Sequence, residues 1–118
     1  MPAYLLVQAD VRDWDAYREY MRRTPRIIEK YGGHFIVRGG EKVTLEGPHE
    51  ETRVAIIEFP TLAHVSAFYA SPEYESVKKF RADAGSARFI AIDGYSVEQW
   101  REAVAQSEQV AADDAARR

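Results

Sequence analysis

The chain has 118 residues, no cysteine and a formal net charge of −3. This length suits one domain, and the lack of cysteine excludes a disulfide framework, a thiolate nucleophile and a cysteine-bound metal. The basic residues form no long block, which argues against a nucleic-acid-binding protein. No apolar stretch approaches the roughly 20 residues that cross a membrane, so we expect no membrane partner and a cytoplasmic location.

The first thirty residues predict a strand followed by a helix. The apolar run Tyr4–Val11 predicts the strand, and it lacks the basic start of a signal peptide. Asp13 suits the N-cap of the helix, whose apolar residues recur at steps of three and four. This helical face contains Trp14, Tyr17, Met21, Thr24, Ile28 and Tyr31. Pro25 cannot donate a backbone hydrogen bond, so we expect a kink or a break near Thr24.

The next segment reads YGGHFIVRGG, from residue 31 to residue 40. Its first glycine pair can end the helix, and its second pair suggests a bulge or a turn. Between them, a strand over 33–38 would place His34 and Arg38 on one side and Phe35 on the other. Residues 41–46 alternate again, which predicts either a bent continuation of this strand or a short separate one.

The second half predicts two more strands and two helices. Residues 53–59 (RVAIIEF) form the third strand, and Thr61 can cap a short helix after it. Ser71 followed by Pro72 is a helix start, and Gly85 stops that helix. Residues 88–95 form the fourth strand, with an apolar centre.

From Ser96 onward the composition changes to Ala, Gln, Glu, Asp and Arg. Ser96 can cap a helix with a thin apolar stripe that includes Trp100. We therefore expect one domain over residues 1–95 and a helical tail over 96–118. The tail has too little apolar surface to fold alone, so it either docks Trp100 on the domain or a partner, or frays.

The predicted order, β-α-β-β-α-β, indicates an α+β, ferredoxin-like sandwich with an antiparallel sheet and the first and third strands in its centre. One face of the sheet should pack under the helices, and we assign to it Leu5-Val7-Ala9, Phe35-Val37, Ala55-Ile57-Phe59 and Ile90-Ile92. The opposite face is also mostly apolar and would be bare in a monomer. The sequence therefore predicts a homodimer that packs sheet on sheet.

Three motifs carry a resemblance to a known family. They are YGGHFIVRGG, then EFP at 58–60, and FYASPEY at 68–74 followed by Lys79 and Arg81. Together they resemble the bacterial domain of unknown function 1330 family, over about residues 2–95, which is similar in fold to the dimeric α/β-barrel superfamily. The resemblance implies a ferredoxin-like fold and a sheet-to-sheet dimer but no established reaction. Superfamily relatives include cofactor-independent monooxygenases, isomerases and small-molecule binders.

His34 and Glu58 are the candidate catalytic residues. The ordinary pKa of histidine, about 6.5, suits a general base, although an edge-strand or dimer-interface role is the alternative. Glu58 ends an apolar strand, which would favour an acid or base with a raised pKa; otherwise it is a strand-end carboxylate that reaches water.

The candidate ligand-binding residues are Arg38, Arg81, Tyr17, Tyr20 and Tyr69. Arg38 would hold a substrate carboxylate or instead pair with Glu58. Arg81 lies on an apolar helical stripe, so it is either an anion site or a residue whose charged end reaches water. The tyrosines are core residues whose hydroxyls need partners if buried.

No metal-binding or cofactor-binding motif occurs around the histidines or glycines, so we expect neither a metal nor a cofactor. Two functions remain open. One is a small-molecule enzyme with cofactor-independent acid–base or oxygen chemistry on an apolar or carboxylate-bearing metabolite. The other is a non-catalytic ligand-binding or interaction module.

Overall fold

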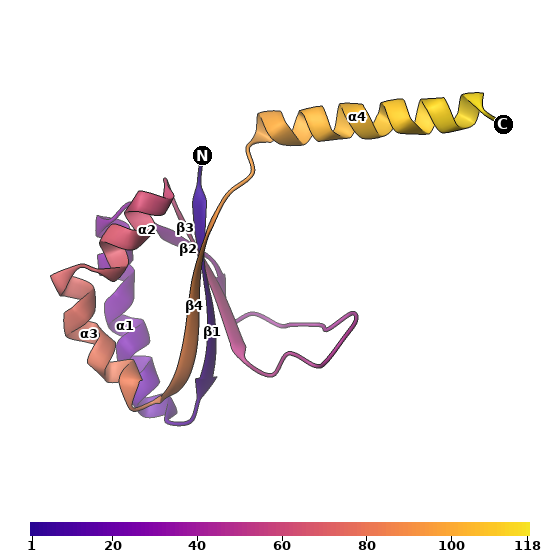
Figure 1. Cartoon of the computed structure of the whole chain (residues 1–118). Coiled ribbons are helices and arrows are strands. Elements are labelled where there is room, and N and C mark those ends of the chain that lie inside the picture. Colours follow the sequence, from indigo (N-terminus) through magenta and orange to yellow (C-terminus); the bar gives the residue numbers. More distant parts are fainter.

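The computed structural model describes all 118 residues and consists of a four-stranded sheet with helices on one face (Figure 1). Its elements, in order, are β1 (Ala3–Val11), α1 (Trp14–Lys30), β2 (His34–Arg38), β3 (Arg53–Phe59), α2 (Leu62–Tyr69), α3 (Pro72–Ala82), β4 (Gly85–Asp93) and α4 (Val97–Ala116). This order confirms the predicted βαββαβ pattern with an extra C-terminal helix.

The sheet has the strand order β2-β3-β1-β4, and every neighbouring pair is antiparallel. The two most apolar strands, β1 and β3, therefore lie in the centre, as predicted. Leu5 of β1 faces Ile57 of β3 across one edge and Ala91 of β4 across the other. Helices α1, α2 and α3 cover the face that carries Leu5, whereas the opposite face, called here the open face, is uncovered (Figure 1).

The core lies between this covered face and the helices. Its largest fully buried side chains are Tyr74, Phe59 and Phe68, and Phe68 packs against both other rings at centroid distances of 4.8 and 5.4 Å. Leu5 and Ile57 are buried beneath them. Full burial of a large apolar side chain contributes about 1.5–3 kcal/mol, so this cluster is a main source of stability.

The predicted N-caps are all present. The side chains of Asp13, Thr61, Ser71 and Ser96 each accept a backbone N–H three residues further on. The predicted break in the first helix is wrong, because α1 continues unbroken through Pro25. Its buried face, which includes Tyr17 and Ile28, packs on the core, and this packing offsets the one backbone hydrogen bond that proline loses.

The segment after β2 and the start of β4 differ from the predictions. Residues 41–46 form no strand but belong to a loop over 39–52, in which Val43 and Leu45 are 74% and 92% exposed. Strand β4 begins at Gly85, three residues before the predicted start, and Gly85 pairs there with Val11 of β1. Gly85 has φ +152° and lies against the Asp10 carbonyl. A Cβ there would meet that oxygen at 1.9 Å, so only glycine fits.

The side assignment of β4 is also wrong. Val7 faces Phe89 and Leu5 faces Ala91, so Phe89 and Ala91 lie on the covered face. Ile90 consequently lies on the open face with its neighbour Leu6. Both sides of β4 are apolar, so the side that faces the core is set by the register with β1 and not by the hydrophobic pattern.

A β-bulge in β2 separates His34 from Arg38, which were expected on the same side of the sheet. Phe35 pairs with Ile57 and Val37 with Ile56, which leaves Ile36 as an extra residue. The bulge reverses the alternation after it. His34 therefore faces Glu58 on the open face, whereas Arg38, opposite Ala55, turns to the helix side.

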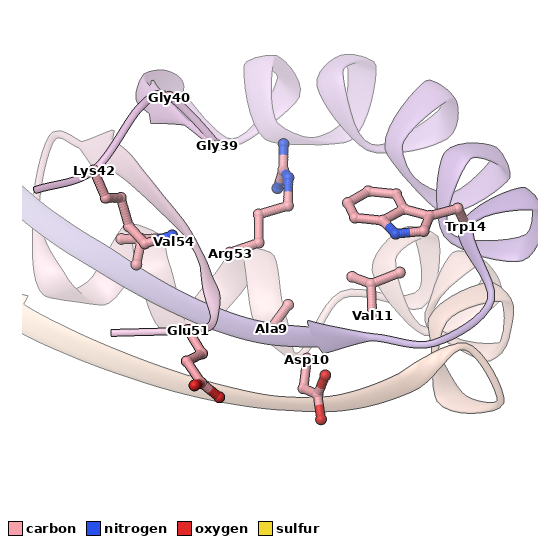
Figure 2. Close-up of a pocket in the computed structure, with 10 residues that line it drawn as sticks. All are labelled: Ala9, Asp10, Val11, Trp14, Gly39, Gly40, Lys42, Glu51, Arg53 and Val54. Atoms are coloured by element: carbon pink, nitrogen blue, oxygen red, sulfur yellow. The ribbon is translucent and has the colours of Figure 1, made fainter. Parts of the chain in front are cut away.

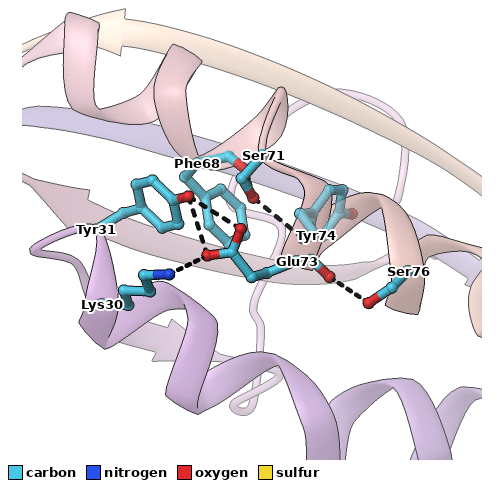
Figure 3. A network of polar contacts seen from close by, with 7 residues as sticks. All are labelled: Lys30, Tyr31, Phe68, Ser71, Glu73, Tyr74 and Ser76. Atoms are coloured by element: carbon cyan, nitrogen blue, oxygen red, sulfur yellow. Dashed lines mark hydrogen bonds and ion pairs between the residues drawn. The ribbon is translucent and has the colours of Figure 1, made fainter.

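A polar contact fastens α3 to the end of α1 (Figure 3). The Glu73 carboxylate accepts from the Lys30 ammonium and, at 3.1 Å, from the Tyr31 hydroxyl. Two residues before Glu73, the Ser71 hydroxyl donates to Phe68 O at 2.7 Å and accepts from Tyr74 N at 3.0 Å. These contacts fix the start of α3 and so determine where Tyr74 lies in the core.

Helix α4 extends away from the domain on the same side as the open face, as does the loop over 39–52 (Figure 1). None of its residues is buried, and Trp100 is 60% exposed. The helix is formed, with a capping box at Ser96 and Gln99, but Trp100 does not dock on its own domain. No helix is long and apolar enough to span a bilayer.

Candidate functional site

The structure separates the predicted site residues into three places. His34 and Glu58 lie on the open face, Arg38 lies at the edge between β2 and α1, and the tyrosines with Arg81 lie at the helix–sheet seam.

On the open face, His34 Nε2 and Glu58 Oε2 are 3.4 Å apart, across neighbouring strands. Tyr4 faces Glu58 from the other side, in the same row of the sheet. Loss of hydration and the Glu58 carboxylate raise the pKa of the Tyr4 hydroxyl. The row borders none of the cavities described below.

Arg38 does not pair with Glu58 but contacts α1. Its guanidinium donates to the Met21 carbonyl at 2.8 Å and lies over the Phe35 ring at 4.5 Å. The predicted alternative of an ion pair with Glu58 is wrong, because the bulge at Ile36 turns Arg38 away while Glu58 pairs with His34.

At the seam, three polar side chains form a chain of hydrogen bonds. The hydroxyls of Tyr20 on α1 and Tyr74 on α3 share a bond of 2.8 Å, and Arg81 Nε donates to Tyr74 Oη at 3.0 Å. Burial raises the pKa of both tyrosines, so their hydroxyls stay protonated. The Tyr17 ring packs beside the Tyr20 ring at a tilt, with centroids 5.5 Å apart.

Arg81 has no carboxylate partner within ion-pair distance. Its guanidinium lies over the Phe89 ring at 4.4 Å, and phenol oxygens supply its polar contacts. Burial by itself would lower the pKa of Arg81, but Tyr74 and the neighbouring phenols raise it. The direct partners of this partly buried cation are therefore a phenol and an aromatic ring, with no carboxylate.

Tyr69 differs from the other tyrosines of the seam. A hydrogen bond with Lys78 lowers the pKa of its hydroxyl, and the charges of Lys78 and Arg81 lower it further. Its ring packs on Tyr74 and Phe89 at centroid distances of 5.4 and 5.8 Å. Its hydroxyl is therefore more disposed to give up a proton than those of Tyr20 and Tyr74.

Tyr69 also lines an apolar cavity between α2 and the β1–β4 half of the sheet. The cavity has a volume of about 380 Å³ and is lined by Leu5, Val65, Ser66, Tyr69, Phe89 and Ala91. This volume is in the range of small-molecule sites, which combine apolar walls with few polar groups. The polar groups here are the hydroxyls of Ser66 and Tyr69.

A second pocket, of about 280 Å³, lies where the loop over 39–52 leaves the sheet (Figure 2). Arg53 and the Trp14 ring face each other across it, while Asp10 and Glu51 point to the other side of β1. It contains none of the predicted site residues. Its walls are largely polar, which suits an apolar ligand less well than the cavity under α2.

Four residues around the cavity and the seam were not among the predicted site residues, namely Ser66, Lys78, Phe89 and Ala91. The spacing of Tyr74, Lys78 and Arg81, at positions i, i+4 and i+7 of one helix, could have placed Lys78 beside the seam. Phe89 and Ala91 were assigned to the opposite face because the side of β4 was wrong. No group of three His, Asp or Glu side chains comes close enough to hold a metal ion.

Fold and cavity together define a ferredoxin-like α+β protein with a pocket between sheet and helices. The chain belongs to the family described as Domain of unknown function (DUF1330), whose model matches residues 2–95. The resemblance seen in the sequence is thereby confirmed. Among curated proteins, none matches the chain.

Solved structures share the fold. A protein of unknown function from Rhodopseudomonas palustris is 25% identical, with a TM-score of 0.66 over 80% of this chain and 83% of that one. A dimeric ferredoxin-like protein from Jannaschia sp. CCS1 is 12% identical, with a TM-score of 0.61 over 80% and 100%. A proposed antibiotic biosynthesis monooxygenase from Nitrosomonas europaea is 15% identical, with a TM-score of 0.51 over 81% and 92%.

Proposed function

We propose that this protein is a homodimer in which each subunit binds a small molecule in the cavity under α2. The ligand has an apolar body and one acidic or enolisable group next to Tyr69. One observation carries this proposal: Arg81 is partly buried without a carboxylate, and its charge reaches Tyr69 at the wall of an apolar cavity.

The charge balance of the seam supports an anionic group on the ligand. Lys78 and Arg81 place two positive charges next to Tyr69, and neither forms an ion pair with an acidic side chain of the protein. An unpaired, partly desolvated cation is costly, and an anion bound nearby would offset that cost. The Ser66 and Tyr69 hydroxyls would contact the group directly, while Arg81 would act through Tyr69.

The dimer is supported by the open face. Ile36, Val37 and Ile92 are 48%, 37% and 50% exposed there, in a sheet that no helix covers on that side. Contiguous apolar surface of this kind is typical of an interface. Similar structures from Jannaschia and Bacteroides fragilis are described as dimeric. We assign His34 and Glu58 to this interface rather than to the cavity.

As an enzyme, the protein would use Tyr69 to take a proton from an O–H or an activated C–H of the ligand and return it later. Lys78 and Arg81 would stabilise the phenolate, and the electron-rich anion left on the ligand is also the species that cofactor-free oxygen chemistry requires. The other candidate is a binding module that uses the same cavity without proton transfer. Its support is that no second acid or base lines the cavity.

The test is a thermal-shift screen of small apolar acids, each matched with its uncharged amide. We expect acids to raise the melting temperature more than amides do. Tyr69→Phe should then weaken the best acid about tenfold, the value of one charge-assisted hydrogen bond. Tyr95→Phe, which alters a tyrosine that is 60% exposed, is the matched control. Equal affinity of both variants would refute the assigned cavity, and turnover of the ligand would separate enzyme from binding module.

A further inference from the structure

Four arginines line a single groove between α1 and the edge strand β2. The groove has a volume of about 420 Å³ and is lined by Arg18, Met21, Arg22, Pro25, Arg38 and Arg53. No acidic side chain lines it, although the whole chain carries a net charge of −3. The groove is thus a local positive site on an acidic protein, and it shares no residue with the cavity under α2.

Two of these arginines are held in place by neutral groups. Arg38 donates to the Met21 carbonyl at 2.8 Å and stacks on Phe35 at 4.5 Å. Arg53 lies over the Tyr17 ring at 5.8 Å and against Gly39, where a Cβ would come within 2.6 Å of Arg53 Nε. Neither has a carboxylate partner. Their guanidinium groups are therefore positioned, and part of their donor capacity is unused.

The other two arginines can reach a bound anion if their side chains leave their present ion pairs. Arg18 pairs with Asp15 at 2.8 Å and Arg22 with Glu19 at 3.4 Å, both along the exposed surface of α1. Arg18 and Arg22 are 63% and 76% exposed. Exposed pairs of this kind contribute little to stability, so a bound anion can compete for these side chains.

We propose that this groove binds a small polyanion, either a phosphorylated compound or a polycarboxylate. Guanidinium groups present paired N–H donors that match the oxygens of phosphate and carboxylate. A ligand with several negative charges would contact Arg38 and Arg53 at fixed positions and draw Arg18 and Arg22 toward it. Met21 and Pro25 supply the remaining lining of the groove. This site is additional to the proposed cavity and does not depend on it.

Isothermal titration of the full chain with pyrophosphate and with citrate, at low ionic strength, tests the proposal. We expect saturable binding of at least one of these anions, with one site per chain. The Arg38→Ala/Arg53→Ala variant should weaken it by at least about tenfold, because two charge-assisted contacts are lost. Binding of pyrophosphate alone would indicate phosphorylated compounds, and binding of citrate alone would indicate polycarboxylates.

The matched control is Arg12→Ala/Arg101→Ala, which removes the same charge from two exposed arginines outside the groove. It should keep the wild-type affinity. An equal loss in both double variants, or no saturable binding of either anion, would overturn the proposal. If the alanine variant does not fold, Arg38→Lys/Arg53→Lys decides the question, because it keeps the charge and removes the paired donors. Unchanged affinity in that variant would also contradict the proposal.

Discussion

Arg81 donates to the hydroxyl of Tyr74 at 3.0 Å, and that hydroxyl in turn bonds to Tyr20 at 2.8 Å. A cation on α3 is thereby joined to α1 through two phenols instead of a carboxylate. The arrangement keeps the positive charge unneutralised next to Tyr69, which is why the seam suits an anionic ligand. It also makes Tyr74 the central member of the chain, with a partner on each side.

Tyr74→Phe should therefore destabilise the protein more than Tyr20→Phe. The first change removes the hydrogen-bond partner of both the Tyr20 hydroxyl and Arg81 Nε, at a cost of about 2–3 kcal/mol. The second leaves Tyr74 bonded to Arg81 and should cost about 1 kcal/mol. Urea denaturation measures both values. Equal losses would contradict the central position of Tyr74.

The contribution of Tyr20 and Tyr74 to the unfolding free energy should change with pH in the opposite direction to that of Tyr69. Burial raises the pKa of Tyr20 and Tyr74, so the native state keeps protons that the unfolded chain releases above about pH 10. The unfolding free energy should fall as the pH rises past that value, and fall less in Tyr20→Phe.

For Tyr69 the pKa is lowered, and the sign is reversed. Its contribution to stability is complete above the unfolded pKa and is lost as the pH falls through the folded pKa. Ultraviolet titration should show one tyrosine that ionises before the others, and Tyr69→Phe should remove this early step. An unchanged titration curve in that variant would disprove the assignment.

Gly85 should not tolerate a side chain. It has φ +152°, and a Cβ would meet the Asp10 carbonyl at 1.9 Å, so Gly85→Ala should cost at least about 3 kcal/mol as β1 and β4 separate. Gly40→Ala is the control, because nothing lies within 4 Å of a Cβ there. Chemical denaturation of the two variants should differ by most of this amount; similar stabilities would contradict the observed start of β4.

Helix α4 offers a test of the proposed dimer. It extends on the open-face side, with Trp100 60% exposed in its first turn and Val110 58% exposed further along the helix. If Trp100 packs on the second subunit, Trp100→Glu should weaken the dimer by about tenfold or more, while Val110→Glu should not. Sedimentation across a concentration series measures this. If the wild-type protein is a monomer at micromolar concentration, the proposed dimer is refuted. If both variants dimerise with the same affinity, only the proposed role of Trp100 is refuted.

Much of the fold was predictable because its signals are local. Asp13 and Ser71 are N-caps whose side chains accept hydrogen bonds from the first turn of their own helices. The apolar runs of β1 and β3 indicate strands whose two faces are both buried, and such strands lie in the centre of a sheet. The strand order then followed from the βαββαβ pattern. Helix α1 shows the limit, because its packing on the core overrides the local effect of Pro25.

The site was less predictable because it depends on register between distant segments. One extra residue at Ile36 moves Arg38 to the opposite side from His34, and no turn residue marks it. The side of β4 that faces the core decides whether Phe89 or Ile90 meets the helices, and both are apolar. Arg81 and Tyr69 were named from their helical positions, but the cavity beside them required Phe89 and Ala91.

The most direct test of the proposed cavity is to fill it. Ala91 lies on its wall, in an exposed position of β4, so Ala91→Phe should occupy the space with little effect on the melting temperature. We predict that the dissociation constant of the best apolar acid rises by at least about tenfold in this variant, because the ligand and the new ring compete for one volume. An unchanged dissociation constant in the folded variant would contradict binding in the cavity under α2.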